Sequence, residues 1–490
     1  MQRTSIAVLF FTILGAVLRF ATLDRQSFWL DELVTVSLLQ LDFGSMLDAI
    51  PGSEATPYLY YVLAWLWAQV FGLGEVGLRS LSALVGAAIV PVTYGAGAVL
   101  VSRRVGLVAA ALVSVHPFLV WYAQEARSYS LLALLAACSV LFFGMALRAE
   151  SKWPYLGWAI ASALAIGTHY FAAFLVLAEI AWLLARSPVR RVAILSTLLP
   201  LGALVAHLPL ALEQRGAGEA VTATSLASRI AGVPKGLAVG YSFPAEIAGS
   251  VVAGVLLLVG LVLLAAGSPV EERRRALVPG GLAAFTIAAP VLLALGGADY
   301  VIVRNTILAI VPAAITLAAG YAANRLGLGA AAALGALLLA IALSLSFDAR
   351  YGRTDWRGAA SRLDAPSVER AIVVTPYMSR SLWSPYLPGL DEPQADASRV
   401  QEIAVLGLAT EGGFSGGPVE PPDVEAPPPP RGFRLAAEER TSTYVLFVYR
   451  APKPTPVSTT ALAGMRATDL QPGILLQRPR PKSRSVLTAG

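Results

Sequence analysis

Long runs of apolar residues dominate the pattern of the chain. A helix needs about 20 apolar residues to cross the hydrocarbon core of a bilayer. Segments that approach or reach this length lie at residues 5–23, 79–100, 105–122, 128–148, 153–169, 170–186, 191–212, 246–266, 277–297, 305–323 and 328–347. The pattern therefore predicts an all-α polytopic membrane protein with about eleven transmembrane helices. The stretch 153–186 is short for two crossings, so tilted or broken helices are expected there.

A further apolar segment, residues 57–72, decides the predicted topology. It is short and rich in Tyr and Trp, which favour the membrane interface. If it lies on the membrane without crossing it, the later basic clusters fall on the same side as Arg3; they are Arg103–Arg104, Arg148–Lys152, Arg186–Arg191, Arg273–Arg275 and Arg325. The positive-inside rule then places the N-terminus in the cytoplasm and the C-terminus outside. We therefore expect interfacial helices within a first outer loop at 24–78.

Composition agrees with this class. Of the 490 residues, 56% are hydrophobic and 14% are charged, whereas soluble domains have about 45–50% apolar and about 25% charged residues. The net charge of +6 is explained by positive cytoplasmic loops, so we expect no nucleic-acid partner. The single cysteine, Cys138, excludes a disulfide framework. The long apolar run after the basic N-terminus predicts an uncleaved first span rather than a signal peptide.

The pattern changes after residue 347. A short helix is expected at 355–365, and strands are expected at 370–377, 402–409 and 443–450. We therefore predict a transmembrane catalytic domain at 1–347 and a small extracytoplasmic α/β domain at 348–450. Residues 451–490 are Pro-rich and basic with little apolar pattern, which predicts a disordered tail.

Two adjacent acids, Asp31 and Glu32, directly follow the first apolar segment. Such a pair is common at the start of a helix, where it caps the first turn, and in a hydrated loop. A carboxylate held at a membrane boundary can also act as a general base, and acids in this position are candidate functional groups. Both interpretations stay open at this point.

Further charged residues lie at ends of spans on the predicted outer face. Glu125 and Arg127 lie between two spans and either close a tight loop as an ion pair or place a guanidinium against an anion such as phosphate. Glu54 and His169 are each ordinary for a loop or a span end. Together they supply two oxygen and nitrogen donors of the kind that bind divalent metal ions.

Five stretches of the sequence together resemble one known superfamily. They are FWLDE, EATPYLYYVLAWLWAQVFGLGEVGLRSLSALVGA, LVWYAQEARSYSLLALL, THYFAAFL and DWRGAA, and they lie between about residues 5 and 365. They look like the bacterial relatives of the dolichyl-phosphate-mannose protein mannosyltransferases. These are GT-C-fold, family-39-like membrane glycosyltransferases, and they include the lipid A aminoarabinose transferases.

The resemblance implies an inverting transfer of a sugar from a polyprenyl-phosphate donor to an acceptor hydroxyl. The reaction would take place on the outer face of the bacterial cytoplasmic (inner) membrane. Asp31 matches the family's catalytic base, and Glu32 matches its second acid. The residues Glu125, Arg127 and Tyr129 match positions near the donor.

The resemblance also suggests how the lipid phosphate is held. Arg127 is the first candidate for a positive group that binds it, and Arg304 is the second. Some relatives carry a divalent metal ion, for which Glu54 and His169 would be the ligands here. The chain departs from the family at Tyr58, which stands where the family's PPLYY motif has its second proline.

The acceptor class stays open, since a glycolipid, an envelope polysaccharide and a protein hydroxyl all suit this chemistry. One alternative function is a transporter or flippase of lipid-linked sugars. Such a protein is expected to have ionisable residues at mid-membrane and inverted repeats, whereas the charges of this chain collect at one face. The other alternative is an inactive GT-C-like assembly subunit.

Overall fold

The computed structural model describes residues 2–214, 225–363, 366–375, 380–387, 389–409, 420–468 and 470–479. The chain divides into two compact units near the boundary expected at residue 347. The first, a helical unit, contains residues 1–25 and 38–348. The second contains the described residues from 349 onward together with residues 26–37, which the sequence had assigned to the membrane domain.

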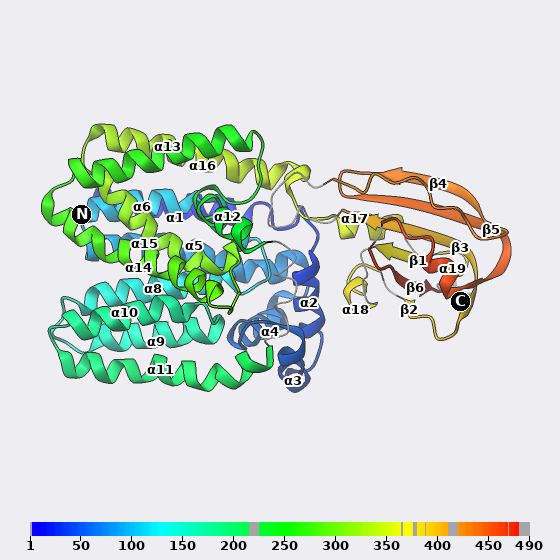
Figure 1. Ribbon diagram of the computed structural model, residues 1–490, viewed down its shortest axis with the longest axis horizontal. Helices are drawn as coiled ribbons and strands as arrows, with labels where there is room; N and C mark the ends of the chain where they lie inside the picture. Colours follow the sequence, from blue (N-terminus) through cyan, green and yellow to red (C-terminus); the bar gives the residue numbers. More distant parts are fainter. Residues whose placement is uncertain are drawn as a thin grey trace, which may run out of the picture. The chain divides into compact units, whose positions relative to one another are not determined.

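All apolar segments that were expected to span the membrane form helices (Figure 1). They are α1 (Gln2–Phe20), α5 (Glu75–Leu100), α6 (Arg103–Ser114) with α7 (Pro117–Ala123), α8 (Tyr129–Ala146), α9 (Trp153–Thr168), α10 (Ala172–Arg186), α11 (Arg190–Glu213), α13 (Glu246–Val262), α14 (Val270–Leu295), η3 (Val303–Ala309) with α15 (Ile310–Tyr321), and α16 (Arg325–Phe347). Among the described residues, seven helices are long and apolar enough to span a membrane, or eight if the bent pair α6–α7 is one span. The predicted helical membrane architecture is confirmed, and the count of eleven spans stays a prediction.

The predicted first outer loop, residues 24–78, contains the helices α2 (Leu30–Leu39), α3 (Phe43–Ser53) and α4 (Leu59–Phe71). The short apolar segment at 57–72 is α4, which has only 13 residues. It ends at Gly72, whose φ of 76° is a left-handed conformation that favours glycine. A helix of this length is too short to cross a bilayer without help, so its interfacial placement stays our prediction.

A break separates α6 from α7, the short helix that precedes the polar turn before α8. The two helices meet at an angle of 58°. Pro117 has no N–H group to continue the ladder of α6. The buried guanidinium of Arg19, from α1, donates to the carbonyl oxygens of Ser114 at 2.9 Å and Val113 at 3.3 Å. Arg19 thereby satisfies carbonyl groups at the end of α6 that have no partner within the helix.

The second unit contains a six-stranded sheet with the order β2-β6-β1-β3-β5-β4. The strands are β1 (Arg370–Thr375), β2 (Leu390–Asp391), β3 (Ala397–Leu408), β4 (Arg434–Arg440), β5 (Tyr444–Ser458) and β6 (Gly473–Gln477). β1 and β3 pair in parallel, and the other pairs are antiparallel. Short helices α17 (Trp356–Arg362), α18 (Arg380–Trp383) and α19 (Thr459–Ala463) accompany the sheet. The expected small α/β domain is confirmed.

The prediction of a disordered tail at 451–490 is wrong for most of that range. β5 runs on to Ser458, α19 follows, and β6 pairs with β1. The prolines in this half of β5, Pro452, Pro454 and Pro456, recur at every second residue, so their nitrogens face one side of the strand. Pro456 pairs with Arg399 of β3, and Pro452 and Pro454 lie in the register shift between Arg450 and Thr455, where a strand tolerates residues that cannot donate. Residues 480–490 lie outside the described residues.

Candidate active site

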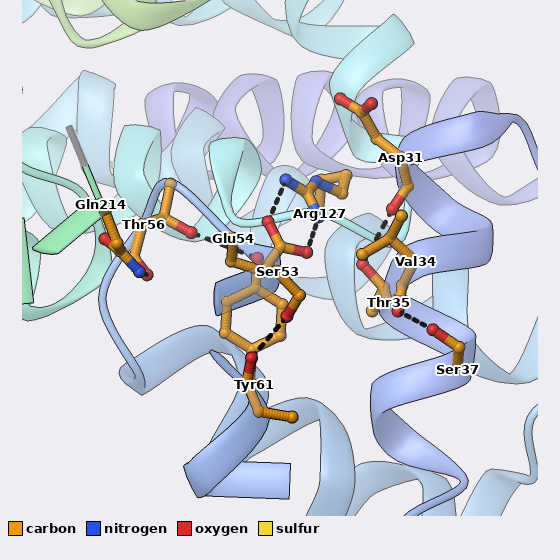
Figure 2. A network of polar contacts seen from close by, with 11 residues as sticks. Asp31, Val34, Thr35, Ser37, Ser53, Glu54, Thr56, Tyr61, Arg127 and Gln214 are labelled. Carbon is orange, nitrogen blue, oxygen red and sulfur yellow. Dashed lines mark hydrogen bonds and ion pairs between the residues drawn. The ribbon is translucent and has the colours of Figure 1, made fainter. Parts of the chain in front are cut away.

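A buried ion pair joins the end of α3 to the turn before α8 in the helical unit. Arg127 donates from Nη1 to Oε1 of Glu54 at 2.5 Å and from Nη2 to Oε2 at 2.8 Å (Figure 2). The side chains are 8% and 4% exposed, respectively. Two parallel N–H···O bonds fix the plane of the guanidinium as well as its position. The partner of Arg127 is thus an acid 73 residues earlier in the chain.

Local structure explains why Glu54 lies there. It is the C-cap of α3, where its N–H donates to Ile50. Thr56, two residues after Glu54, forms a hydroxyl–hydroxyl bond of 3.2 Å with Tyr61, near the start of α4 (Figure 2). The backbone oxygen of Thr56 accepts from Gln214 at the end of α11 at 3.4 Å. The PYLYY motif therefore folds the loop back onto the helices and presents Glu54 to Arg127.

The QEARSY motif forms a tight turn between α7 and α8. The side chain of Gln124 donates to the oxygens of Leu18 and Thr22, both at 2.8 Å, which fixes the turn against α1. The backbone N–H of Arg127 donates to the oxygen of Glu125 at 2.8 Å. Glu125 is fully buried. The turn thus holds two charged residues away from water, a costly arrangement that requires charged or polar partners.

A second cluster contains three further residues that the sequence predicted. The Arg304 guanidinium, in η3, lies 5.6 Å from the centre of the Tyr129 ring, a cation–π contact. The rings of Tyr129 and His169 are 5.9 Å apart. The structure therefore brings together a residue from the start of α8, one from the end of α9 and one from η3.

His169 lies just beyond α9, as its C-cap. Burial, followed by the positive charges of Arg304 and Arg127, lowers the pKa of His169 to about 3. Its imidazole is therefore neutral at ordinary pH. Its Nδ1 accepts from the N–H of Phe171 at 3.2 Å, which fixes the orientation of the ring.

Sequence reasoning missed two tyrosines beside this cluster. The hydroxyl groups of Tyr122 and Tyr241 are hydrogen-bonded to each other. The ring centres of Tyr122 and Tyr129 are 4.7 Å apart. The ring centres of Tyr241 and Phe118 are 5.4 Å apart. Tyr241 directly follows Gly240, which ends α12 (Leu226–Val239) with a φ of 87°. The available signal was an aromatic residue that directly follows a glycine in a predicted outer loop.

Asp31 and Glu32 lie in the first turn of α2, in the second unit. Oε2 of Glu32 accepts from the backbone N–H of Trp29 at 3.2 Å, and Glu32 is fully buried. The capping interpretation is therefore confirmed for Glu32. Asp31 is half-buried, and its backbone oxygen accepts from the Thr35 hydroxyl at 3.2 Å (Figure 2). The catalytic roles of both acids stay predictions.

The predicted metal ligands do not form a set that fits a divalent ion. Both carboxylate oxygens of Glu54 accept from Arg127, and Nδ1 of His169 accepts from a backbone N–H. Across the part of the chain that the structure describes, no three or more His, Cys, Asp or Glu residues are grouped as a metal site would require. A positive guanidinium occupies the place next to Glu54 where a cation would bind.

Solved structures of membrane glycosyltransferases align with the chain at low identity. ArnT from Cupriavidus metallidurans bound to undecaprenyl phosphate has 14% identity and a TM-score of 0.49, with 90% of this chain and 97% of that chain covered. The Archaeoglobus fulgidus oligosaccharyltransferase tethered to an acceptor peptide has 13% identity and a TM-score of 0.48, with 74% and 57% covered. Arabinofuranosyltransferase AftD from Mycobacteria has 18% identity and a TM-score of 0.45, with 77% and 29% covered. The chain thus spans little more than half of the archaeal enzyme.

No curated protein sequence matches the chain. One family does match, over residues 55–212, and it is described as dolichyl-phosphate-mannose-protein mannosyltransferase. This range contains Arg127, Tyr129 and His169, and it leaves Asp31 and Arg304 outside. The predicted resemblance to these membrane glycosyltransferases is therefore confirmed for the part of the chain from α4 to α11.

Proposed function

We propose that the protein is a membrane glycosyltransferase that moves a sugar from a polyprenyl-phosphate donor to an acceptor hydroxyl, with inversion at the anomeric carbon. The acceptor is a glycolipid, an envelope polysaccharide or a protein on the outer face of the bacterial cytoplasmic membrane. The observation that carries the proposal is the group of cationic and aromatic residues around the buried Arg127 and the half-buried Arg304. Arg127 lies in the part of the chain that matches the mannosyltransferase family.

The two arginines suit the leaving group of this reaction. As the glycosidic bond breaks, negative charge grows on the phosphate of the lipid. A cation that is already fixed in place stabilises that charge more than it stabilises the ground state, and this difference lowers the barrier. Glu54 holds Arg127 by two hydrogen bonds, and the Tyr129 ring lies against Arg304. Neither guanidinium therefore needs to reorganise during the reaction.

Because His169 is neutral, the positive charge of this region comes from Arg127 and Arg304. Its low pKa follows from its burial and from the same two cations. An imidazole in this state accepts or donates hydrogen bonds without adding charge. We assign His169 a role in orienting the ring of Tyr129, and through it Arg304, rather than in binding a metal ion.

Asp31 is the proposed general base. It would take the proton of the acceptor hydroxyl while the oxygen attacks the anomeric carbon on the face opposite to the phosphate. The new carbon–oxygen bond forms as the bond to the phosphate oxygen breaks, and the lipid phosphate leaves with the bonding electron pair. This assignment rests on the FWLDE resemblance and on the partial exposure of Asp31 at the start of α2. Glu32 is assigned to capping that helix.

The test follows the release of polyprenyl phosphate from radiolabelled polyprenyl-phosphate sugars by the purified wild type and by Asp31→Asn. A panel of donors is used, with envelope extracts as acceptors. We expect wild-type turnover of at least one donor, loss of turnover in Asp31→Asn, and retained donor binding. Asp48→Asn, the same change at an exposed acid of α3, is the matched control and should keep full activity.

Two outcomes would contradict the proposal. Turnover by Asp31→Asn at the wild-type rate would remove the assigned base. Movement of an intact lipid-linked sugar across proteoliposomes, without release of the lipid phosphate from any donor of the panel, would instead identify a transporter or flippase.

A further inference from the structure

Two of the motifs that carry the family resemblance are joined in the second unit, although more than 320 residues separate them. FWLDE begins at Phe28, and DWRGAA begins at Asp355. The segment 26–37 belongs to the same compact unit as the residues from 349 onward. The contacts that join them are hydrogen bonds to three consecutive residues, Gln26, Ser27 and Phe28.

Ser27 provides the central contact. Its hydroxyl is buried, donates to the oxygen of Thr354 at 3.0 Å and accepts from the N–H of Trp356 at 2.9 Å. Trp356 is the first residue of α17, so its N–H has no acceptor within the helix. Asp355 caps the same helix by accepting from Gly358 at 2.8 Å. The N–H of Trp356 also donates to the oxygen of Thr354 at 3.1 Å, so Ser27 and the turn before α17 share it.

The residues on either side of Ser27 are held as well. The side-chain oxygen of Gln26 accepts from the N–H of Arg353 at 3.1 Å. The N–H of Phe28 donates to the hydroxyl of Tyr386 at 2.6 Å. Tyr386 follows α18, whose Trp383 packs against Trp356 with ring centres 5.0 Å apart.

These contacts restrict the position of Asp31, which follows shortly after in the sequence. α2 begins at Leu30, two residues after Phe28. The intervening Trp29 donates its N–H to Glu32, so the start of the helix is fixed from inside. Once the backbone of residues 26–28 is held, the position of Asp31 within this unit follows from the geometry of one helical turn.

We propose that Ser27 and Tyr386 are positioning residues, through which the extracytoplasmic domain holds the segment that carries Asp31. The inference rests on the proposed function, in which Asp31 is the base. It gives the domain a direct part in catalysis, and it explains why DWRGAA occurs together with FWLDE. Proton transfer requires the base within hydrogen-bond reach of the acceptor hydroxyl. A displacement of about 1 Å can slow such a step by about 100-fold.

The experiment compares Tyr386→Phe and Ser27→Ala with a matched control, Tyr449→Phe. Tyr449 is buried in the same unit, and its hydroxyl donates to Pro427 at 2.6 Å, far from the segment in sequence. Two quantities are measured on the purified full chain: kcat and KM for the donor, and the hydrogen exchange of the amides of residues 28–37. Thermal unfolding is recorded for each variant to show that it folds.

We expect a fall in kcat of about 10-fold or more in Tyr386→Phe and Ser27→Ala, within the range that misplacement produces. KM should stay within about 2-fold, since no donor contact is removed, and amide exchange at 28–37 should become faster. Tyr449→Phe should match the wild type in all three quantities. A general loss of stability would instead affect the control variant as well.

The inference is overturned if Tyr386→Phe and Ser27→Ala match Tyr449→Phe in kcat and in amide exchange. In that case a loss of turnover in Asp31→Asn would leave the proposed function standing. Full activity of Asp31→Asn would overturn both, because there would be no base to position.

Discussion

Arg127 and Glu54 form a bidentate ion pair that is almost completely buried, between the turn before α8 and the end of α3. Their separation of 73 residues makes this pair a tertiary contact, which no local pattern encodes. The pair fixes the guanidinium to which we assign the lipid phosphate. It also occupies both oxygens of the acid that the sequence assigned to a metal ion.

Removal of one partner of this pair should destabilise the helical unit strongly. Glu54→Ala leaves the Arg127 charge buried beside a lost acceptor, which typically costs about 3–5 kcal/mol. The measurement is the unfolding midpoint of the purified protein in denaturant. Glu271→Ala breaks the exposed pair with Arg275 and should have little effect. Equal effects of the two substitutions would contradict a structural role for the buried pair.

Substitution of the proposed phosphate-binding arginines should lower turnover, and Arg127→Gln should lower stability as well because it leaves Glu54 buried without its partner. We expect Arg127→Gln and Arg304→Gln each to lower kcat by about 10²–10³-fold, the loss seen when one fixed donor to a developing negative charge is removed. Initial rates with saturating donor provide the measurement. Lys152→Gln removes an exposed positive charge on the opposite predicted side and serves as the control. A rise in KM with unchanged kcat would show that the arginines bind the ground state equally well.

Chelation should leave the reaction unchanged. Arg127 occupies both oxygens of Glu54, and a backbone N–H is bonded to Nδ1 of His169. We therefore expect the same turnover with and without EDTA, and no stoichiometric metal in the purified protein by elemental analysis. Loss of activity that Mn²⁺ or Zn²⁺ restores would reinstate Glu54 and His169 as ligands.

His169 should make the protein less stable in acid. The pKa of His169 in the folded protein is about 3, below the value of about 6.5 in an unfolded chain. The unfolded state therefore binds the proton first, and stability falls as the pH drops from about 6.5 towards 3. His169→Gln should flatten this part of the curve of unfolding midpoint against pH. An unchanged curve would show that His169 titrates alike in both states.

The topology can be tested by labelling single cysteines in a Cys138→Ala background. Ser53 and Ser442 are exposed and lie on the predicted outer side, so cysteines there should react with an impermeant maleimide in intact cells. A cysteine at the exposed Gly74 should react from outside as well. Labelling at Gly74 only after the membrane is opened would show that α4 crosses the membrane.

The membrane helices could be predicted because their signal is local. A run of about 20 apolar residues has few other stable structures, and each predicted run forms a helix. The residues around Arg127 were also predicted, because charged residues are few in such a chain and these lie at span ends on the side opposite to the basic clusters. Their partners were not predictable, since the pairing of Arg127 with Glu54, or of Ser27 with Trp356, depends on how distant segments fold together.

In the second unit, local sequence signals predicted only part of the structure. Its hydrophobic strands β1 and β3 were predicted, whereas β6 is short and the second half of β5 carries prolines that ordinarily argue against a strand. The tertiary pairing with β3 overrides this local preference. The sequence therefore indicated a domain of the right kind but an end about 27 residues too early, at residue 450 instead of Gln477.

The alternating prolines of β5 have a consequence for the part of this strand that extends beyond β4. Beyond Arg450, where the described pairing with β4 ends, this edge of the strand lacks the N–H groups of Pro452, Pro454 and Pro456. A strand from another molecule needs those donors in order to add to a sheet. The missing donors make this part of β5 a poor template for a strand from another copy, which is how prolines protect the edges of sheets.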